Sequence, residues 1–422
     1  MSDIDLSNHR VVDAHCHPFE ESSKVMSEDE LAFIADQLSG FSNTAFLVPP
    51  EILDQYRRAQ LVEKKKLDEE YGISACEADL RLHAQNIVLY KTMTHELARF
   101  LDCPPNSMDI LQARNRRSAN YRDYLRQIFD DARIDVLNVD DGYSELAVRH
   151  AIPTIDLEHF QTYVPARVAR TTRVEPLFQK SLDASSRFDE MESDFISSLE
   201  HAVRRQGAVA FKCVIAYRSG LCVRKTRVEE AKKDFRKYKS KRSRSPSRDR
   251  PVLKNLRNYL IWNAVRKSVD LNVPFLFHTG VGDVDIRLGE CNPTCLWDML
   301  VDEDLRRARV VLVHAGYPYV SEAAFLTSIL PNVYLDLSIL VPMAGVNPAR
   351  IAEVLEMAPL TKVMYASDHA LPETYWLSAK VAKKMLGDAL GKMVDAEFLN
   401  EDEAYQAAEL VLSGNAKRLY KL

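Results

Sequence analysis

The sequence has no apolar run long enough to cross a membrane, and its first residues do not resemble a secretion signal. A membrane helix needs about 18 uninterrupted apolar residues, and polar or charged residues break every apolar stretch of this chain sooner. Residues 1–10 lack both the basic start and the apolar stretch of a signal peptide. We therefore expect a cytoplasmic protein with no membrane partner.

Cysteine is scarce, with an odd total of seven in 422 residues. This number in a long chain without a secretion signal does not suit a disulfide framework, so we expect mostly free thiols. Cys291 and Cys295 have the spacing of half a zinc knuckle, but no matching pair of cysteines or histidines follows. We interpret these two as structural residues.

A Gly-x-Gly-x-x-Gly motif is also missing after every predicted strand, which weakens a dinucleotide-binding interpretation. Short apolar, β-branched segments instead alternate with longer helical or polar stretches, as in parallel α/β proteins. We predict a single (β/α)₈ TIM barrel over residues 1–422, and an open doubly wound sheet stays as the alternative. The predicted strands are residues 10–15, 134–139, 168–174, 208–214, 273–278, 310–314, 333–337 and 363–367.

Two stretches exceed what such a barrel needs. Residues 20–131 predict a helical cap inserted after the first strand. Residues 224–250 hold 13 lysines and arginines against 4 acidic residues, and we expect a mobile, solvated insertion there. Nuclear import through residues 236–250 is an alternative that we do not favour. The net charge of −5 gives no reason to expect nucleic acid as a partner.

His15 and His17 lie one residue apart at the end of the first predicted strand. Alternate side chains of a strand share a face, so this spacing aims both imidazoles at one point, which suits a transition metal such as zinc. Alone, the pair is better explained by chance on a half-exposed strand.

Other unusual polar residues also fall at strand ends, namely Lys212, His278, His314 and Asp368. The carboxyl ends of parallel barrel strands open on one face, so these side chains and the two histidines should converge in one cavity. His278 could be a hydrogen-bonded core residue, and Asp368 could cap a helix. Lys212 is harder to explain structurally, because a buried ammonium without a partner is costly. Together they predict a metal site.

This pattern resembles the amidohydrolase superfamily. It is closest to the amidohydrolase-related branch, which includes a domain fused to glutamine synthetase in some plant and fungal proteins, and stand-alone bacterial relatives. The branch is identified by residues 13–19, 211–221, 277–288, 313–319, 334–338, 366–368 and 414–420. The resemblance is specific for the branch and weak for the substrate, since these barrels host many reactions.

The resemblance implies roles by matching position. One divalent metal, usually zinc and in some cases manganese, would be held by His15, His17 and Asp368, often with His278. In members with two metals, a carboxylated Lys212 would bridge them, and His278 and His314 would hold the second. In members with one metal, His314 would act as an acid, base or electrophilic group. We favour one zinc ion.

The expected reaction is hydrolysis of an amide or other non-peptide C–N bond in a small carboxylate-bearing substrate. Asp368 would shuttle the proton of a metal-activated water, and His314 would stabilise the oxyanion. Candidate substrate-binding residues near the strand ends are Arg173, Tyr217, Arg218, Asp285 and Arg287.

Two alternatives stay open. The branch also includes zinc-dependent decarboxylases of aromatic and unsaturated acids, so a non-oxidative decarboxylase is the second interpretation. A catalytically retired barrel that serves as a regulatory or binding protein is the third. The expected partner is a small-molecule substrate, and the sequence leaves a homo-oligomer open.

Overall fold

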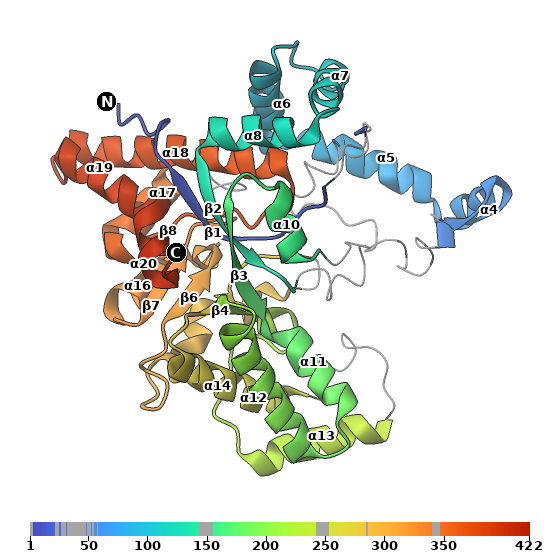
Figure 1. The fold of residues 1–422 in the computed structure, drawn as a ribbon, viewed down its shortest axis with the longest axis vertical. Coiled ribbons are helices and arrows are strands. Elements are labelled where there is room, and N and C mark those ends of the chain that lie inside the picture. The colour runs from blue at the N-terminus through green and yellow to red at the C-terminus, as the bar shows by residue number, and fades with distance from the viewer. Residues whose placement is uncertain are drawn as a thin grey trace.

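The computed structural model describes residues 3–21, 58–142, 155–241, 253–283, 286–339 and 347–422, with a few single residues between 25 and 56. Eight parallel strands stand in chain order, each beside the next. They are β1 (Val11–Cys16), β2 (Ile134–Asp140), β3 (Arg167–Arg173), β4 (Ala208–Cys213), β5 (Phe275–His278), β6 (Val310–Val313), β7 (Val333–Asp336) and β8 (Val363–Met364). The predicted TIM-barrel fold is confirmed (Figure 1).

The last strand is shorter than predicted, because the backbone N–H groups that follow Met364 donate to groups other than the backbone of β7. The N–H of Tyr365 donates to the carbonyl of Val411 at 2.8 Å, and the N–H of Ser367 donates to Asp13 Oδ1 at 2.9 Å. Regular pairing with β7 therefore stops at Met364.

The sheet closes on itself between β1 and the segment that follows β8. The N–H of Ala14 donates to the carbonyl of Tyr365 at 3.1 Å, and the N–H of Asp368 donates to the carbonyl of His15 at 2.9 Å. These bonds join the first and last strands into a nearly complete barrel, which excludes the open doubly wound sheet.

The two faces of the strands form two apolar clusters. The larger cluster joins outward-facing residues such as Phe211 and Phe277 to the surrounding helices. The smaller one fills the barrel and includes residues two apart on the same strands, as the period of a strand requires. Its members from the strands and from α20 (Asn415–Tyr420) include Val12, Ala14, Val136, Ala210, Leu276, Val311, Val313, Met364, Ala366, Ala416 and Leu419.

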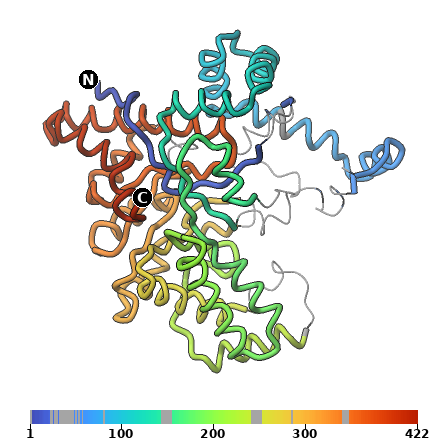
Figure 2. Tube along the Cα trace, in the orientation of Figure 1, coloured from blue at the N-terminus to red at the C-terminus, as the bar shows by residue number. Residues whose placement is uncertain are grey.

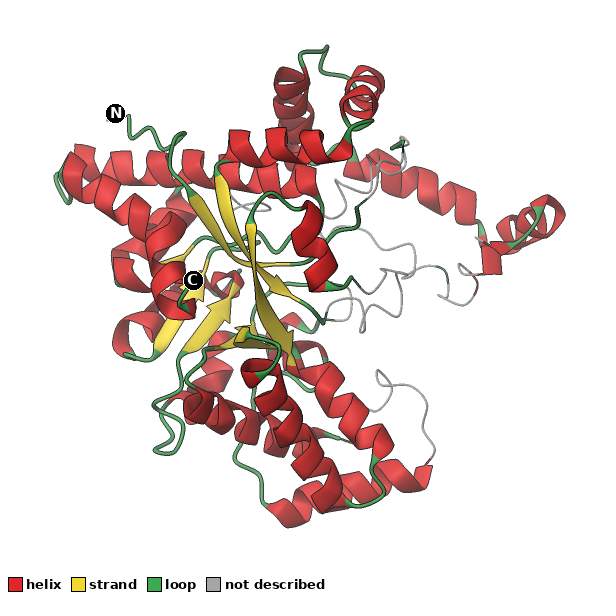
Figure 3. Ribbon diagram, viewed as in Figure 1, coloured by secondary structure: helices red, strands yellow, loops and turns green. Residues whose placement is uncertain are grey.

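Helices surround the barrel, with short 3₁₀ turns at several strand ends (Figure 3). The helices after β2 are α10 (Leu157–Tyr163), α11 (Val174–Ala184), α12 (Phe188–Arg204), α13 (Val228–Lys241), α14 (Lys254–Leu271), α15 (Trp297–Leu300), α16 (Val320–Ile329), α17 (Ala349–Met357), α18 (Pro372–Asp395) and α19 (Glu401–Glu409). Within the described residues, none of the helices combines the length and the apolar character that a bilayer-spanning segment needs.

The long stretch between β1 and β2 is helical where the structure describes it. Its helices are α4 (Leu61–Tyr71), α5 (Ile73–Ala84), α6 (Val88–Leu101), α7 (Ser107–Arg117) and α8 (Tyr121–Ala132). Helix α8 packs against α18, whereas α4 and α5 extend away from the barrel (Figures 1 and 2). A capping role for residues 20–131 stays a prediction.

The basic stretch 224–250 is described as far as residue 241. Residues 228–241 form α13, which packs against α14 and buries Ala231 and Phe235. Lys232 pairs with Asp189 at 3.1 Å. The rest of the stretch lies outside the described residues, so its predicted mobility is untested.

A buried ion pair fastens the inserted helices to the barrel. Arg114 of α7 donates to Glu373 of α18 at 3.0 Å, and the Tyr124 hydroxyl of α8 donates to the same carboxylate oxygen at 2.9 Å. The Arg114 and Glu373 side chains are only 8% and 1% exposed. The pair therefore lies in a water-poor contact between elements far apart in the sequence.

Changing Arg114 to Met should lower the free energy of unfolding by about 3–5 kcal/mol, because it leaves the Glu373 carboxylate buried without its cation. Changing Glu373 to Leu in the same chain should recover part of the loss. Chemical denaturation measures both, and the exposed Arg116→Met is the matched control, expected to change stability by about 0.5 kcal/mol or less. An Arg114→Met protein as stable as wild type would contradict this anchoring role.

Candidate metal centre

A β-bulge in the first strand aims His15 and His17 into the barrel. Val12 and Ala14 already face inward, so simple alternation would turn His15 outward. Between Asp13 and Cys16 the register against β2 shifts by one residue, and this extra residue restores an inward direction for both histidines. Their side chains are buried and come from one strand end, as the sequence spacing predicted.

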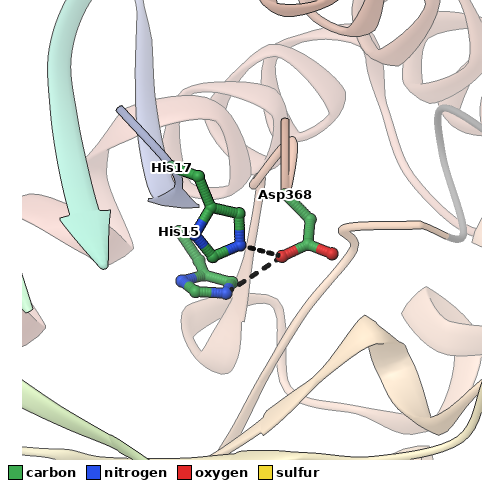
Figure 4. A group of neighbouring side chains, drawn as sticks. All are labelled: His15, His17 and Asp368. Atoms are coloured by element: carbon green, nitrogen blue, oxygen red, sulfur yellow. Dashed lines mark hydrogen bonds and ion pairs between the residues drawn. The ribbon is translucent and has the colours of Figure 1, made fainter. Parts of the chain in front are cut away.

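Asp368 lies in the segment after β8, which is hydrogen-bonded to β1, and its side chain points toward the two histidines. Its Oδ1 lies 3.0 Å from His15 Nε2 and 3.2 Å from His17 Nε2, and both rings point at this carboxylate (Figure 4). The side chain of Asp368 is 20% exposed, whereas that of His15 is fully buried. The three-residue group is thus buried at His15 and accessible to solvent at Asp368.

This donor set fits a divalent metal ion. The three ligand atoms lie within 4.8 Å of one another. Two donors bound to one tetrahedral zinc at about 2.1 Å are about 3.4 Å apart, close to the separations found here. Two imidazoles with one carboxylate are also the ligand types of many catalytic zinc sites, which keep a further position open. His15, His17 and Asp368 can therefore hold one ion.

Burial keeps the His15 ligand uncharged. It lowers the pKa of His15 to about 4, and the nearby Lys212 cation adds to the shift. Burial would raise the pKa of Asp368, but the neighbouring imidazoles, that of His314 first, hold it well below its ordinary value. Neutral imidazole and ionised carboxylate are the forms that bind a metal.

Lys212 approaches the same group from β4. Its side chain is buried, with Nζ 3.0 Å from His15 Nε2. Burial lowers the pKa of Lys212, although the carboxylates of Asp368 and Asp140 oppose the shift. The structure thus brings the lysine to the three ligand residues, and burial favours its neutral form relative to a lysine in water. Its bridging of two metals stays a prediction.

His278 turns its Nε2 away from the three ligand atoms. This nitrogen lies 2.9 Å from the carbonyl of Val281, which can only accept, so Nε2 carries the proton. Burial, the largest cause, lowers the pKa of His278 well below its ordinary value, so the ring is neutral and Nδ1 accepts. This Nδ1 lies 3.0 Å from His314 Nε2. In this arrangement His278 orients His314, and its predicted ligand role stays untested.

His314 faces the site because its backbone departs from the strand. Its neighbour Val313 faces the barrel interior, so alternation would turn His314 outward. Instead φ is +70° at His314 and +46° at Ala315, and Asp368 has φ of +61°. Left-handed values are uncommon for residues other than glycine and often mark functional sites.

Asp336 and Ser338 fix the orientation of His314, and sequence reasoning gave neither a role. The backbone N–H of His314 donates to Asp336 Oδ1 at 3.0 Å, and the ring Nδ1 lies 2.8 Å from Ser338 Oγ. Burial lowers the pKa of His314 to about 3, so its ring is neutral, and its Nε2 lies 3.8 Å from Asp368 Oδ2. Residues 334–338 are among those that carry the family resemblance, and this was the only sequence signal that could have pointed to Asp336 and Ser338.

Arg173 is engaged in a buried ion pair with Asp140, which sequence reasoning also missed. Nε of Arg173 donates to Asp140 Oδ2 at 2.9 Å, and both side chains are at least nine-tenths buried. The guanidinium outweighs the effect of burial and lowers the pKa of Asp140 to about 2. This pair joins the ends of β2 and β3 beside the metal group.

The other predicted substrate-binding residues differ in placement. Tyr217 is at the site, with its ring centroid 4.6 Å from that of His278. Arg218 follows Tyr217 and is partly exposed, and Arg287 is 66% exposed and 3.7 Å from Glu290. Asp285 lies outside the described residues. Contact of these residues with a substrate stays a prediction.

A closed parallel barrel with two histidines and an aspartate at its carboxyl end defines the class of metal-dependent barrel enzymes. A family model described as amidohydrolase matches residues 192–422. The chain therefore belongs to the amidohydrolase family. Protein fluG of Emericella nidulans is 28% identical over 376 residues, which are 83% of this chain and 42% of fluG. The chain thus spans less than half the length of that relative.

Solved structures agree with the fold. A Lactobacillus casei protein proposed to be a metal-dependent hydrolase superposes with a TM-score of 0.78 at 23% identity, covering 100% of this chain and 98% of its own. A uronate isomerase from Bacillus halodurans superposes with a TM-score of 0.62 at 13% identity, covering 98% and 94%. At these identities the likeness establishes the barrel and leaves the reaction open.

Changing His17 to Ala should weaken zinc binding by more than about 100-fold, since even partners of the ligands are worth about 10–100-fold. Zinc titration monitored by calorimetry measures the change. The exposed His201 of α12 offers a matched control, and His201→Ala should bind zinc like wild type. Equal zinc affinity of the wild-type and His17→Ala proteins would refute the assignment.

Proposed function

We propose that this protein hydrolyses an amide or other non-peptide C–N bond in a small carboxylate-bearing molecule, using one zinc ion. The supporting observation is the convergence of His15, His17 and Asp368, with the Asp368 side chain 20% exposed. A bound divalent ion would lower the pKa of a water molecule from about 15.7 to about 7, which supplies a nucleophile at neutral pH.

Asp368 is the proposed proton shuttle. Its Oδ1 faces both histidine ligands, whereas Oδ2 is the oxygen directed toward His314. A carboxylate with a strongly lowered pKa stays ionised, so it can accept the proton of the attacking water and pass it to the leaving nitrogen.

His314 is the proposed oxyanion donor. Its ring is neutral, its Nδ1 lies 2.8 Å from Ser338 Oγ, and its Nε2 lies 3.0 Å from His278 Nδ1. With the proton on Nε2, this N–H would exchange His278 for the substrate oxyanion as its acceptor. A fixed N–H in a cavity shielded from water stabilises developing negative charge better than a mobile one. Arg218 and Arg287 would supply the cations for the substrate carboxylate, because Arg173 is already paired with Asp140.

Changing Asp368 to Asn should lower turnover by at least about 100-fold, because the amide cannot accept the proton. The two histidines should still retain part of the metal. The measurement pairs metal analysis of the purified protein with a screen of N-acyl amino acids, γ-glutamyl compounds and aromatic acids. Full activity of the variant on any substrate that wild type turns over would refute the shuttle role.

Oxygen-18 water distinguishes hydrolysis from decarboxylation on the substrate found in that screen. Hydrolysis should place one solvent oxygen in the carboxylate product and release an amine or ammonia. Mass spectrometry of the products gives the answer. Release of carbon dioxide without incorporation of solvent oxygen would overturn the hydrolase proposal and favour the decarboxylase alternative.

A further inference from the structure

Two part-buried thiols meet beside the barrel mouth. Cys222 Sγ lies 2.7 Å from Cys295 Sγ, and neither cysteine forms a disulfide in the structure. A covalent S–S bond is about 2.05 Å long, so the sulfurs need to move by only about 0.7 Å to bond. Cys222 lies in the segment after β4, and Cys295 lies in η3 (Pro293–Leu296), in the segment after β5.

Backbone contacts hold the two segments together near this pair. The N–H of Leu221, next to Cys222, donates to the carbonyl of Glu290 at 2.8 Å. A side chain on Gly220 would come within 3.0 Å of the Glu290 Cβ, so the segments are in close contact. The thiols are therefore brought together by the fold of both segments, and 73 residues of chain separate them.

The buried cysteines of the chain have other partners. Cys213 donates to Glu175 at 3.2 Å, Cys291 donates to the carbonyl of Arg287 at 3.2 Å, and Cys16 lies 3.6 Å from the Asn138 carbonyl. By contrast, Cys222 and Cys295 are each partly exposed, so a small oxidant in solution can reach them.

The same two segments also carry residues of the metal site. Tyr217 begins the segment that leads to Cys222, and its ring packs beside His278. The hydroxyl of Tyr217 accepts the backbone N–H of Asp283, in the segment that leads to Cys295, at 3.1 Å. A covalent bond between the two thiols would add a second, stronger link between these segments.

We propose that Cys222 and Cys295 are a reversible oxidation site that fastens the segment after β4 to the segment after β5. With hydrogen peroxide as oxidant, the Cys222 sulfur attacks one peroxide oxygen and becomes a sulfenic acid, and the other oxygen leaves as water. The Cys295 sulfur then attacks the sulfenic sulfur and displaces its oxygen as a second water. Two thiols lose two protons and two electrons, and one peroxide becomes two waters.

The roles of the two cysteines follow from their surroundings. Burial raises the pKa of Cys295 to about 12, and the neighbouring Cys222 adds to the shift. Cys295 therefore keeps its proton and serves as the second, resolving thiol. The site rests on the thiol geometry alone and is independent of the proposed hydrolysis.

To test the site, the protein is treated with hydrogen peroxide. Mass spectrometry of its peptides then maps the disulfides. We expect a peptide that joins Cys222 to Cys295, with a loss of two hydrogens, and its disappearance on reduction with dithiothreitol. Cys222→Ser and Cys295→Ser should each abolish it. The matched control Cys103→Ser removes another part-buried thiol and should leave the link intact.

Hydrogen–deuterium exchange tests the mechanical consequence. Exchange in residues 215–223 and 286–296 should slow by about tenfold on oxidation of wild type, and not in Cys295→Ser. Absence of the linked peptide, or its appearance with another cysteine in place of Cys222 or Cys295, would overturn the oxidation site. A linked protein with unchanged exchange would overturn the fastening role.

Discussion

Closure of the barrel and construction of the metal centre depend on the same residues. The hydrogen bond from the N–H of Asp368 to the carbonyl of His15 joins the last strand end to the first. The side chains of these two residues also meet, with Asp368 Oδ1 3.0 Å from His15 Nε2. A barrel that failed to close would therefore lose the three-residue group, because His15 and Asp368 lie at opposite ends of the strand order. Stability and function are coupled at this junction.

The site buries several polar groups, and paired interactions offset the cost of removing them from water. Asp140 and Arg173 neutralise each other at the ends of β2 and β3. The imidazoles of His15 and His314 remain uncharged because burial lowers their pKa values. Neutral ligands next to an ionised carboxylate leave a net negative site, which favours a cation.

Short segments beyond the strand ends determine how the site is used. The left-handed backbone at His314 turns its ring into the cavity, and the carbonyl of Val281 fixes the tautomer of His278. Tyr217 links the segments after β4 and β5 above these histidines. The strands thus supply a rigid frame, and these segments orient the groups that would contact a substrate.

The sequence by itself determined the parallel strands and predicted the location of the candidate site, whereas closure into a barrel was seen only in the tertiary structure. Apolar runs and strand periodicity are local properties, so seven strands were predicted to within two residues at each end. Polar residues at the ends of those runs showed where the site would be, because parallel strands all end on one face. Tertiary structure alone decided the rest. The bulge that turns His15 inward, the pairing of Arg173 with Asp140, and the approach of Cys222 to Cys295 each depend on contacts between segments distant in sequence, to which local patterns are insensitive.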